Sequence, residues 1–329
     1  MNKNIKVLLG LLSDGSFHSG SDLGDKLGLT RGAIWKLIKQ LDKYEIEIEA
    51  KTNQGYRISG GLELLDKKII AQSISAEYKA FVDDLVILDE TPSTNTYLAE
   101  LIKTKTKNNN ICFAESQSAG KGRLGRRWVS PYARNIYLSL RWDFAKELSE
   151  LSGLSLAIAV AVAEALNGYG IKKDIALKWP NDVLWQKRKL AGILIEISGE
   201  AHNICHTIIG VGLNVNMPQK TSQAIDQPWC SVAQITKDIP QRNKLAGLLL
   251  DNLLITLSEF QKNGLKSFFE KWHELDITYG KQVTIIIPQQ QKISGIGSGI
   301  NDKGCFLLKD SSNEIQTFAV GEVSLKIHA

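Results

Sequence analysis

The stretch AGKGRLGRRW, residues 119–128, distinguishes a dinucleotide-binding fold from other fold classes. Its glycines, Gly120, Gly122 and Gly125, have the G-x-G-x-x-G spacing of a dinucleotide-binding turn. That turn must open a helix at its third glycine, but here two arginines and a tryptophan follow, and then Pro131. A helix does not begin readily in such a segment, so the spacing does not indicate a Rossmann fold. A kinase loop is excluded because no H-R-D or D-F-G follows, and no G-x-x-x-x-G-K-[ST] occurs.

The same stretch is strongly basic. From Glu115 to Arg134 the chain has five basic residues and one acidic residue. Glycines allow the backbone to approach an anion closely, while Lys121 and Arg123 can neutralise its charge. Trp128 offers a flat surface to an aromatic base. The segment fits a phosphorylated, adenine-like ligand, and on its own it fits a flexible basic surface loop equally well.

Length and composition set the outer limits. The chain has 329 residues, enough for two or three domains, and its 23% charged residues are ordinary for a globular protein. The net charge of +5 is too small for a chain that coats nucleic acid, so a basic site must be local. Four scattered cysteines and an N-terminus without a secretory pattern predict a reduced protein of the cytoplasm. The apolar segment 153–170, interrupted by Glu164, predicts a buried helix and not a membrane span.

Residues 1–62 have the pattern of a winged helix-turn-helix domain. Ser19 or Ser21 can cap a helix that ends at Gly28, and Thr30 can cap a second helix. Two short helices joined by a turn that contains glycine are typical of a helix-turn-helix. The alternating segment IEIEAKTNQGYRIS, residues 46–59, predicts the hairpin that forms the wing.

The second of these helices is mainly positive. Four basic residues and one acid, Asp42, lie on it or directly after it. Such cations contact DNA phosphates, and a helix of this kind fits the major groove. A solvated helix face is the alternative, but the order of the elements and the wing favour DNA binding. The candidate DNA contacts are Ser19, Thr30, Arg31, Trp35, Lys36, Lys39 and Gln54.

The rest of the chain divides into two further regions. A glycine pair at residues 60–61 predicts a hinge. Beyond it, strands and helices alternate, and hairpin-like neighbours favour a mixed, largely antiparallel sheet flanked by helices. From residue 277, short strands broken by Gly and Asn predict a small β-barrel. Before the barrel, the predicted strands cover 84–90, 110–116, 135–142, 174–180, 190–198 and 206–216, and the predicted helices cover 94–103, 151–168, 241–262 and 264–274.

Further polar residues gather where the chain is predicted to turn. Those before a helix are explained equally well by N-capping, and each segment alone is a weak signal. The residues concerned are Ser93, Thr94 and Asn95 at a predicted helix start, Lys178, Asn181 and Asp182 around Pro180, and Lys189 at the entrance of a strongly apolar strand.

In combination and in this order, the segments resemble the biotin protein ligases. K-W-P-N-D and the Gly/Arg loop are the most specific of them. With the winged helix in front, the chain is similar over essentially its whole length to the bacterial proteins that are both biotin ligase and biotin operon repressor. The resemblance rests on STN at 93–95, QSAGKGRLGRRW at 117–128, KWPND at 178–182, RKLAGIL at 188–194 and GVGLNVN at 210–216.

The resemblance implies an α+β fold of three domains. Residues 1–62 would form the winged helix-turn-helix domain. Residues 63–276 would form a central α+β catalytic domain with a mixed, class II synthetase-like sheet. Residues 277–329 would form a small SH3-like β-barrel.

The implied reaction joins the carboxylate of biotin to AMP from ATP, with release of pyrophosphate. The biotinyl group then passes to one lysine of biotin carboxyl carrier protein, the carrier domain of acetyl-CoA carboxylase. Because two anions meet in the first step, positive charge and positioning should dominate catalysis, and Mg²⁺ would accompany ATP. The implied repressor is a homodimer that forms when biotinyl-AMP is bound, by edge pairing of GILIEIS at 192–198, and that binds operator DNA. No membrane partner is implied.

The resemblance also implies roles for individual residues. Arg123 would contact the biotin carboxylate and the acyl-phosphate, and Asp182 would accept a proton from the incoming lysine. Leu124 stands where relatives often carry arginine, so no role is carried over to it. The implied catalytic residues are Arg123, Lys178, Asp182 and Lys189. The implied biotin-binding residues are Ser93, Thr94, Asn95, Gln117, Gly120, Lys121, Gly122, Arg123 and Lys189. The implied ATP- or adenylate-binding residues are Trp128, Lys178, Asn181 and Asn214.

Two other classes of function remain open at this point. One is a transcription factor whose central domain senses biotin without catalysis, and the other is a related acyl-adenylating ligase of the lipoate type. The intact set of Arg123, Lys178 and Lys189 argues against a sensor, while K-W-P-N-D and G-K-G-R-L-G favour biotin over lipoate. The group HNICH, residues 202–206, lacks the glutamate of a zinc helix motif, which favours a structural role and no metal site.

Overall fold

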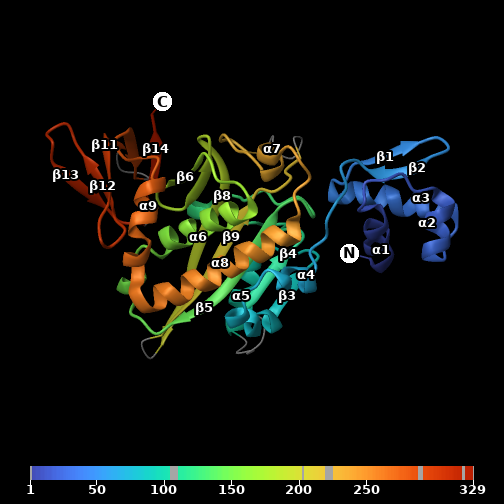
Figure 1. The fold of residues 1–329 in the computed structure, drawn as a ribbon, viewed down its shortest axis with the longest axis horizontal. Coiled ribbons are helices and arrows are strands. Elements are labelled where there is room, and N and C mark those ends of the chain that lie inside the picture. Colours follow the sequence, from blue (N-terminus) through green and yellow to red (C-terminus); the bar gives the residue numbers. More distant parts are fainter. Residues whose placement is uncertain are drawn as a thin grey trace.

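The computed structural model describes residues 2–103, 110–201, 204–218, 225–287, 292–320 and 323–328. Three units follow one another along the chain (Figure 1). A helical unit with a two-stranded sheet lies at one end, a seven-stranded sheet with helices lies in the centre, and a five-stranded sheet lies at the other end. The predicted α+β multidomain fold is confirmed.

The N-terminal unit is the predicted winged helix-turn-helix. The Ser19 side chain accepts a hydrogen bond from the Asp22 backbone N–H, and Gly28 ends that helix in a left-handed conformation. Thr30 caps the next helix by accepting from Ala33 N–H. The elements are α1 (Lys3–Leu12), α2 (Gly20–Leu27), α3 (Arg31–Gln40), η1 (Leu41–Tyr44), and the hairpin strands β1 (Ile48–Lys51) and β2 (Gly55–Ile58).

Helix α3 turns its apolar side chains inward and its basic ones to solvent. Ile34, Leu37 and Ile38 are buried in the core of the unit. Trp35 is unusual because half of this large side chain is exposed on the same helix. The candidate DNA contacts Thr30, Arg31, Trp35, Lys36, Lys39 and Gln54 are exposed, and Ser19 is half-buried as a helix cap.

The central sheet has the strand order β3-β4-β5-β9-β8-β7-β6. Among the strands that the structure describes in this sheet, only β3 and β4 pair in parallel, so the sheet is mixed and largely antiparallel, as predicted. Strand β7 was not predicted, because it is short and directly follows the turn at Pro180. The strands are β3 (Leu85–Leu88), β4 (Ile111–Ala114), β5 (Ile136–Phe144), β6 (Ile175–Lys178), β7 (Asp182–Trp185), β8 (Arg188–Ala201) and β9 (Ile204–Leu213).

Helices cover the two faces of this sheet. On one face α6 (Leu154–Tyr169) and α8 (Arg242–Asn263) pack on each other and on the strands, and they form the large core of the molecule. On the other face α5 (Thr94–Lys103) packs on β4, β5 and β9 over a smaller core. Residues 148–169 are long and apolar enough to cross a membrane by composition alone, but most of this segment is buried against the sheet and α8. The structure thus agrees with the prediction that the apolar segment 153–170 forms a buried helix.

Shorter helical segments complete the central unit. They join the strands and lead from the winged unit into the sheet and from the sheet toward the C-terminal unit (Figure 1). They are α4 (Lys67–Gln72), η2 (Ala76–Asp84), η3 (Arg123–Gly125), η4 (Leu148–Leu151), α7 (Val232–Thr236), η6 (Gly264–Phe268) and α9 (Phe269–Leu275).

The C-terminal unit is an all-antiparallel sheet with the order β13-β12-β11-β10-β14. Trp179 of the central unit packs on its Phe306 and donates a hydrogen bond to the Gly304 carbonyl oxygen. The β unit is thereby attached beside the K-W-P-N-D turn. Its strands are β10 (Gln282–Ile286), β11 (Lys292–Ile300), β12 (Phe306–Lys309), β13 (Ile315–Phe318) and β14 (Ser324–Ile327).

The winged unit is docked on the central unit. Tyr132 and Ala133, which follow the Gly/Arg loop, are buried in the core cluster of the winged unit. The ring of Tyr132 lies 5.2 Å from that of Tyr44, directly after the α3 helix. Lys6 of α1 forms an ion pair with Asp89 at 2.9 Å.

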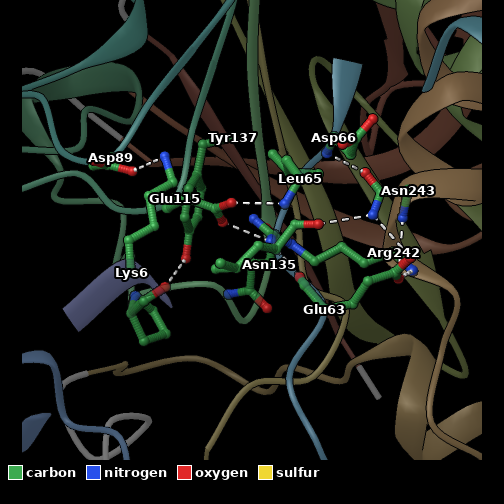
Figure 2. Close-up of polar contacts among 12 residues, drawn as sticks. Lys6, Glu63, Leu65, Asp66, Asp89, Glu115, Asn135, Tyr137, Arg242 and Asn243 are labelled. Carbon is green, nitrogen blue, oxygen red and sulfur yellow. Dashed lines mark hydrogen bonds and ion pairs between the residues drawn. The ribbon is translucent and has the colours of Figure 1, made fainter. Parts of the chain in front are cut away.

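A buried ion pair fastens the linker between these two units (Figure 2). Arg242 Nη1 lies 2.6 Å from Glu115 Oε2, and each side chain is only 3% exposed. The other oxygen of Glu115 accepts from the backbone N–H of Leu65 in the linker, at 2.7 Å. Arg242 also donates to the backbone oxygens of Glu63 and Asn135. The predicted hinge is therefore followed by a segment that is held firmly in place.

Candidate active site

The predicted ligand residues meet in one site over the middle strands β5, β9 and β8 of the central sheet, beside the start of α5. It consists of a larger cavity of about 420 Å³ and a smaller one of about 50 Å³. The two cavities share part of their lining, so they adjoin each other within one site. The shared residues are Gly122, Arg123, Trp128, Asn181 and Lys189.

The smaller cavity has uncharged polar groups at one end, the start of α5, and the cations Lys121, Arg123 and Lys189 also line it. Ser93, Thr94 and Asn95, all buried, line it at the start of α5. The side-chain oxygen of Gln117 accepts from the Thr94 backbone N–H at 2.9 Å and from the Thr94 hydroxyl at 3.2 Å. Gln117 thus caps the helix, and its amide group donates in turn to Ser130 Oγ. The helix start is therefore capped by Gln117, and no capping bond to the Ser93 or Thr94 side chain occurs among the described residues.

The larger cavity is cationic. Lys189 Nζ lies 2.7 Å from Asp182 Oδ1, and both side chains are largely buried. Burial lowers the pKa of Lys178, and the neighbouring Asp182 carboxylate opposes that shift. Burial likewise lowers the pKa of the Arg123 guanidinium. Three cations thus share a partly desolvated cavity with few carboxylates, an arrangement suited to a phosphate or acyl-phosphate group.

Trp128 forms the wall between the two cavities. A Cβ atom at Gly212 would lie 2.4 Å from the indole ring, and one at Gly192 would lie 2.9 Å from it. Only glycine at these positions of β9 and β8 allows the ring to lie flat on the sheet. Lys189 Nζ lies 5.4 Å from the ring centroid. These contacts explain why G-I-L and G-V-G-L accompany the basic loop in the sequence.

Two buried polar atoms of the wall have no hydrogen-bond partner within the described ranges. They are Trp128 Nε1, a donor, and Asn214 Oδ1, an acceptor. Leaving such groups unpaired costs roughly 1–3 kcal/mol each. Because both residues line the larger cavity, the pocket fits a ligand with polar groups of its own.

The loop 119–128 folds back on itself over the pocket. Trp128 N–H donates to the Gly120 carbonyl oxygen at 2.8 Å, and Gly122 N–H donates to that of Arg126 at 2.7 Å. Arg123 reaches Asn181 Oδ1 at 3.4 Å and the Val323 carbonyl oxygen of the C-terminal unit at 3.5 Å. The loop is therefore a lid of the pocket and not a free surface loop, and it contacts the β unit.

All of the predicted catalytic, biotin and adenylate residues line this pocket or the adjoining cavity beneath the loop. The candidate DNA contacts belong to the winged unit and are not among the lining residues. Of HNICH, His202 and Asn203 lie outside the described residues, Cys205 is buried, and His206 lies 2.9 Å from Asp143.

Sequence reasoning missed two parts of the site. Residues 225–227 and Trp229 line the larger cavity, and the carbonyl oxygen of Pro228 accepts from the Lys189 backbone N–H. Ser139 and Glu196 stand behind the smaller cavity, in contact with Asn95. A signal for these two was present, since each is a polar residue within an apolar strand, in IYLSLRW and GILIEIS.

Comparison with known proteins identifies each unit of the chain. Residues 87–214 match the model of the biotin/lipoate A/B protein ligase family, residues 4–57 match an HTH domain, and residues 278–326 match the biotin protein ligase C terminal domain. The chain is 35% identical to the bifunctional ligase/repressor BirA of Escherichia coli (strain K12), over 97% of this chain and 96% of that protein. It is 30% identical to the biotin–[acetyl-CoA-carboxylase] ligase of Mycobacterium tuberculosis, over 73% of this chain and 88% of that protein.

A solved structure agrees with these matches. The biotin protein ligase from Aquifex aeolicus in complex with biotin and ATP superposes with a TM-score of 0.63 at 29% identity, covering 74% of this chain and 99% of that one. Fold and pocket together define a ligase that carries a DNA-binding domain. The chain belongs to the biotin/lipoate A/B protein ligase family, and within it the chain is a BirA-type biotin protein ligase with a helix-turn-helix repressor domain.

Proposed function

We propose that the chain forms biotinyl-5′-AMP from biotin and ATP and then transfers biotin to a specific lysine of biotin carboxyl carrier protein. The observation that carries this proposal is a pair of adjoining cavities, with uncharged polar groups of α5 and Gln117 at one end and a cluster of cations at the other. The uncharged end suits a ureido ring, and the cationic end suits a carboxylate that meets a phosphate. The relatives named above, which are biotin ligases, favour biotin over lipoate as the substrate.

The first step brings two anions together. An oxygen of the biotin carboxylate attacks the α-phosphorus of ATP, and the bond to pyrophosphate breaks. Arg123 and Lys189 stabilise the charge that gathers at the new acyl-phosphate, and Lys178 stabilises the phosphate. Trp128 carries the adenine, and Asn181 and Asn214 hold the nucleotide. Ser93, Thr94 and Gln117, together with the backbone of Gly120 and Gly122, position the biotin rings.

The second step transfers the acyl group. The neutral amine of the carrier lysine attacks the acyl carbon, AMP leaves, and the amine loses a proton. Asp182 is the candidate acceptor of that proton once the Lys189 ammonium has turned to the phosphate. The lid loop keeps the adenylate inside the pocket until the carrier arrives.

Mg²⁺ fits this site as a partner of the nucleotide. The residues that the structure describes contain no group of three side chains able to hold a metal ion by themselves. Mg²⁺ binds through one or two carboxylates together with substrate phosphates, and Asp182 and Asp226 line the cationic cavity. These two carboxylates would hold the ion, which would neutralise phosphate charge. Chelation by EDTA should therefore stop pyrophosphate release.

The same protein would repress transcription of the biotin operon in the cytoplasm. Strand β7 pairs with β8 only as far as Gly192, and among the described residues the rest of β8 pairs on one side only, with β9. This free edge supports a homodimer formed by strand pairing when biotinyl-AMP is bound. The dimer would present two winged units to two half-sites of operator DNA.

Pyrophosphate release tests the first step. We expect biotin-dependent release with the wild type, and with Lys189→Ala a loss of adenylation rate far larger than the loss of folding stability. Arg123→Gly should release biotinyl-AMP into solution, where it labels lysines of unrelated proteins. Unchanged pyrophosphate release by Lys189→Ala, or labelling confined to the carrier lysine by Arg123→Gly, would refute the corresponding role.

A further inference from the structure

A chain of buried hydrogen bonds runs behind the uncharged end of the pocket. Asn95 Nδ2 donates to Glu196 Oε2 at 2.6 Å, and Asn95 Oδ1 lies 2.5 Å from Ser139 Oγ. Ser139 Oγ lies 2.6 Å from Thr94 Oγ1, which lines the cavity. Ser139 is fully buried, and Thr94 and Asn95 are only 4% and 3% exposed. Four side chains from α5, β5 and β8 thus form one connected network.

The sheet is shaped to admit this network. Gly210 of β9 pairs with Ser139 of β5 and with Leu194 of β8. A Cβ atom at Gly210 would lie 2.3 Å from Asn95 Oδ1. Glycine at this position leaves room for the Asn95 amide, so Asn95 can span the sheet from Ser139 to Glu196.

The ends of the network fix the direction of every hydrogen bond. The Glu196 carboxylate can only accept, so it accepts a hydrogen bond from the Asn95 amide nitrogen, which turns Asn95 Oδ1 toward Ser139. That oxygen can also only accept, so the single hydroxyl hydrogen of Ser139 is donated to it. The Thr94 hydroxyl must then donate inside the protein, either to Ser139 Oγ or to the Gln117 side-chain oxygen. In both cases Thr94 Oγ1 presents a lone pair, and no proton, to the cavity.

We propose that Glu196, Asn95 and Ser139 are positioning residues that fix Thr94 Oγ1 as a hydrogen-bond acceptor and thereby select a ligand whose head group donates an N–H. This inference rests on the proposed function, and it names the basis of substrate choice in the same pocket. A ureido ring provides such an N–H, whereas a dithiolane ring, as in lipoate, provides none. The Asn95 side-chain amide donates to Glu196 and to the Leu194 carbonyl oxygen and accepts from Ser139, so it acts on the ligand through Thr94.

Binding measurements with two ligands test the proposal. Calorimetric Kd values would be determined on the full chain for biotin and for a biotin derivative that carries a methyl group on one ureido nitrogen. Two such derivatives exist, and the one to which the wild type binds more weakly would be used. Ser139→Ala should raise the Kd of biotin on the order of tenfold and leave the Kd of ATP unchanged. The preference for biotin over the N-methyl derivative should shrink, because Thr94 is then free to turn its proton toward the ligand.

Glu196 provides a second and milder variant, because its side chain is only half-buried. Glu196→Ala should weaken biotin binding and reduce the preference in the same way, while Glu196→Gln, which retains an acceptor oxygen, should restore both. Thr207→Val is the matched control. It removes a buried hydroxyl from β9 that bonds only the Trp142 carbonyl oxygen among the described residues, and it should change neither Kd.

The outcomes separate the proposal from the function on which it rests. If the wild type binds biotin but Ser139→Ala and Glu196→Ala weaken both ligands in the same ratio, the network merely supports the fold and the proposal is wrong. Equal binding by Glu196→Ala and Glu196→Gln would also overturn it. If the wild type does not bind biotin, both the proposed function and this inference are refuted.

Discussion

At the scale of single residues, the pocket depends on charge that is only partly solvated. Burial lowers the pKa of Lys178, and Asp182 opposes this effect. A lowered pKa means that the ammonium group loses its proton at a lower pH than a free lysine does. If the protonated form is needed at the phosphate, the rate of pyrophosphate release should fall on the alkaline side as pH rises through this lowered pKa.

Lys178→Arg tests this assignment. Arginine stays charged at any pH at which the protein is folded, so the alkaline loss of rate should move to higher pH. The measurement is the pH profile of pyrophosphate release for both proteins at saturating biotin and ATP. An identical alkaline limb in the wild type and the variant would show that another group titrates.

A second prediction at this scale concerns Gly212. Its replacement by Ala places a methyl group 2.4 Å from the Trp128 ring, which must leave the pocket wall. We expect the Kd of ATP to rise at least on the order of tenfold, with a destabilisation of about 1–3 kcal/mol from overpacking. Calorimetry and urea unfolding measure the two effects.

Gly168→Ala is the control for this substitution. Gly168 lies within α6, and a Cβ there meets no atom closer than 3.9 Å. The change should stabilise the helix slightly, by about 0.5–1 kcal/mol, and leave ATP binding unchanged. Normal ATP affinity in Gly212→Ala would mean that Trp128 does not shape the nucleotide site.

At the scale of elements, the buried ion pair between Glu115 and Arg242, which holds the linker, should contribute strongly to the free energy of unfolding. Arg242→Met leaves the Glu115 carboxylate buried without its cation, which typically costs about 3–5 kcal/mol (Figure 2). Arg141→Met breaks a surface pair with Asp143 and should cost less than about 1 kcal/mol. Urea unfolding of both variants measures the difference. A similar small loss in both would show that the buried pair is not important for stability.

Local sequence patterns predicted most of these elements, because their causes are local. The Ser19 and Thr30 caps and the Gly28 terminator act within a few residues of the helices that they bound. Strand β7 was missed since a four-residue strand after Pro180 has the pattern of a turn. The partnership of Glu115 with Arg242 joins residues 127 positions apart, and no local pattern contains it.

The residues of the site were predicted less completely than the helices and strands. Motif resemblance identified many of the residues that line the pocket, because these are confined to short, characteristic segments, but it missed those of 225–229. Ser139 and Glu196 escaped it, since their importance depends on the register of β5, β9 and β8, which brings them to Asn95. Trp128 was predicted at the ligand, but its support by Gly192 and Gly212 became visible only in the folded sheet.

At the scale of the whole molecule, we expect the free edge of β8 to link ligation to repression by forming the dimer. Ile197 on this edge is 47% exposed. Ile197→Asp places two like charges near each other in a paired-edge dimer, so dimerisation and operator binding should weaken at least tenfold, while the monomer retains ligase activity. Ile239→Asp, at a position that is 63% exposed outside the sheet, is the control. Sedimentation with biotin and ATP measures the dimer, and unchanged dimerisation of Ile197→Asp would place the interface elsewhere.

The central claim is that this pocket activates biotin and that the protein delivers it to a carrier lysine. The direct test incubates the full chain with labelled biotin, ATP, Mg²⁺ and a biotin carboxyl carrier domain, and locates the label by peptide mass spectrometry. We predict one biotinyl group on a single carrier lysine, dependent on ATP and lost with Lys189→Ala. Biotin binding without any transfer to the carrier would contradict the claim and would leave the protein a sensor.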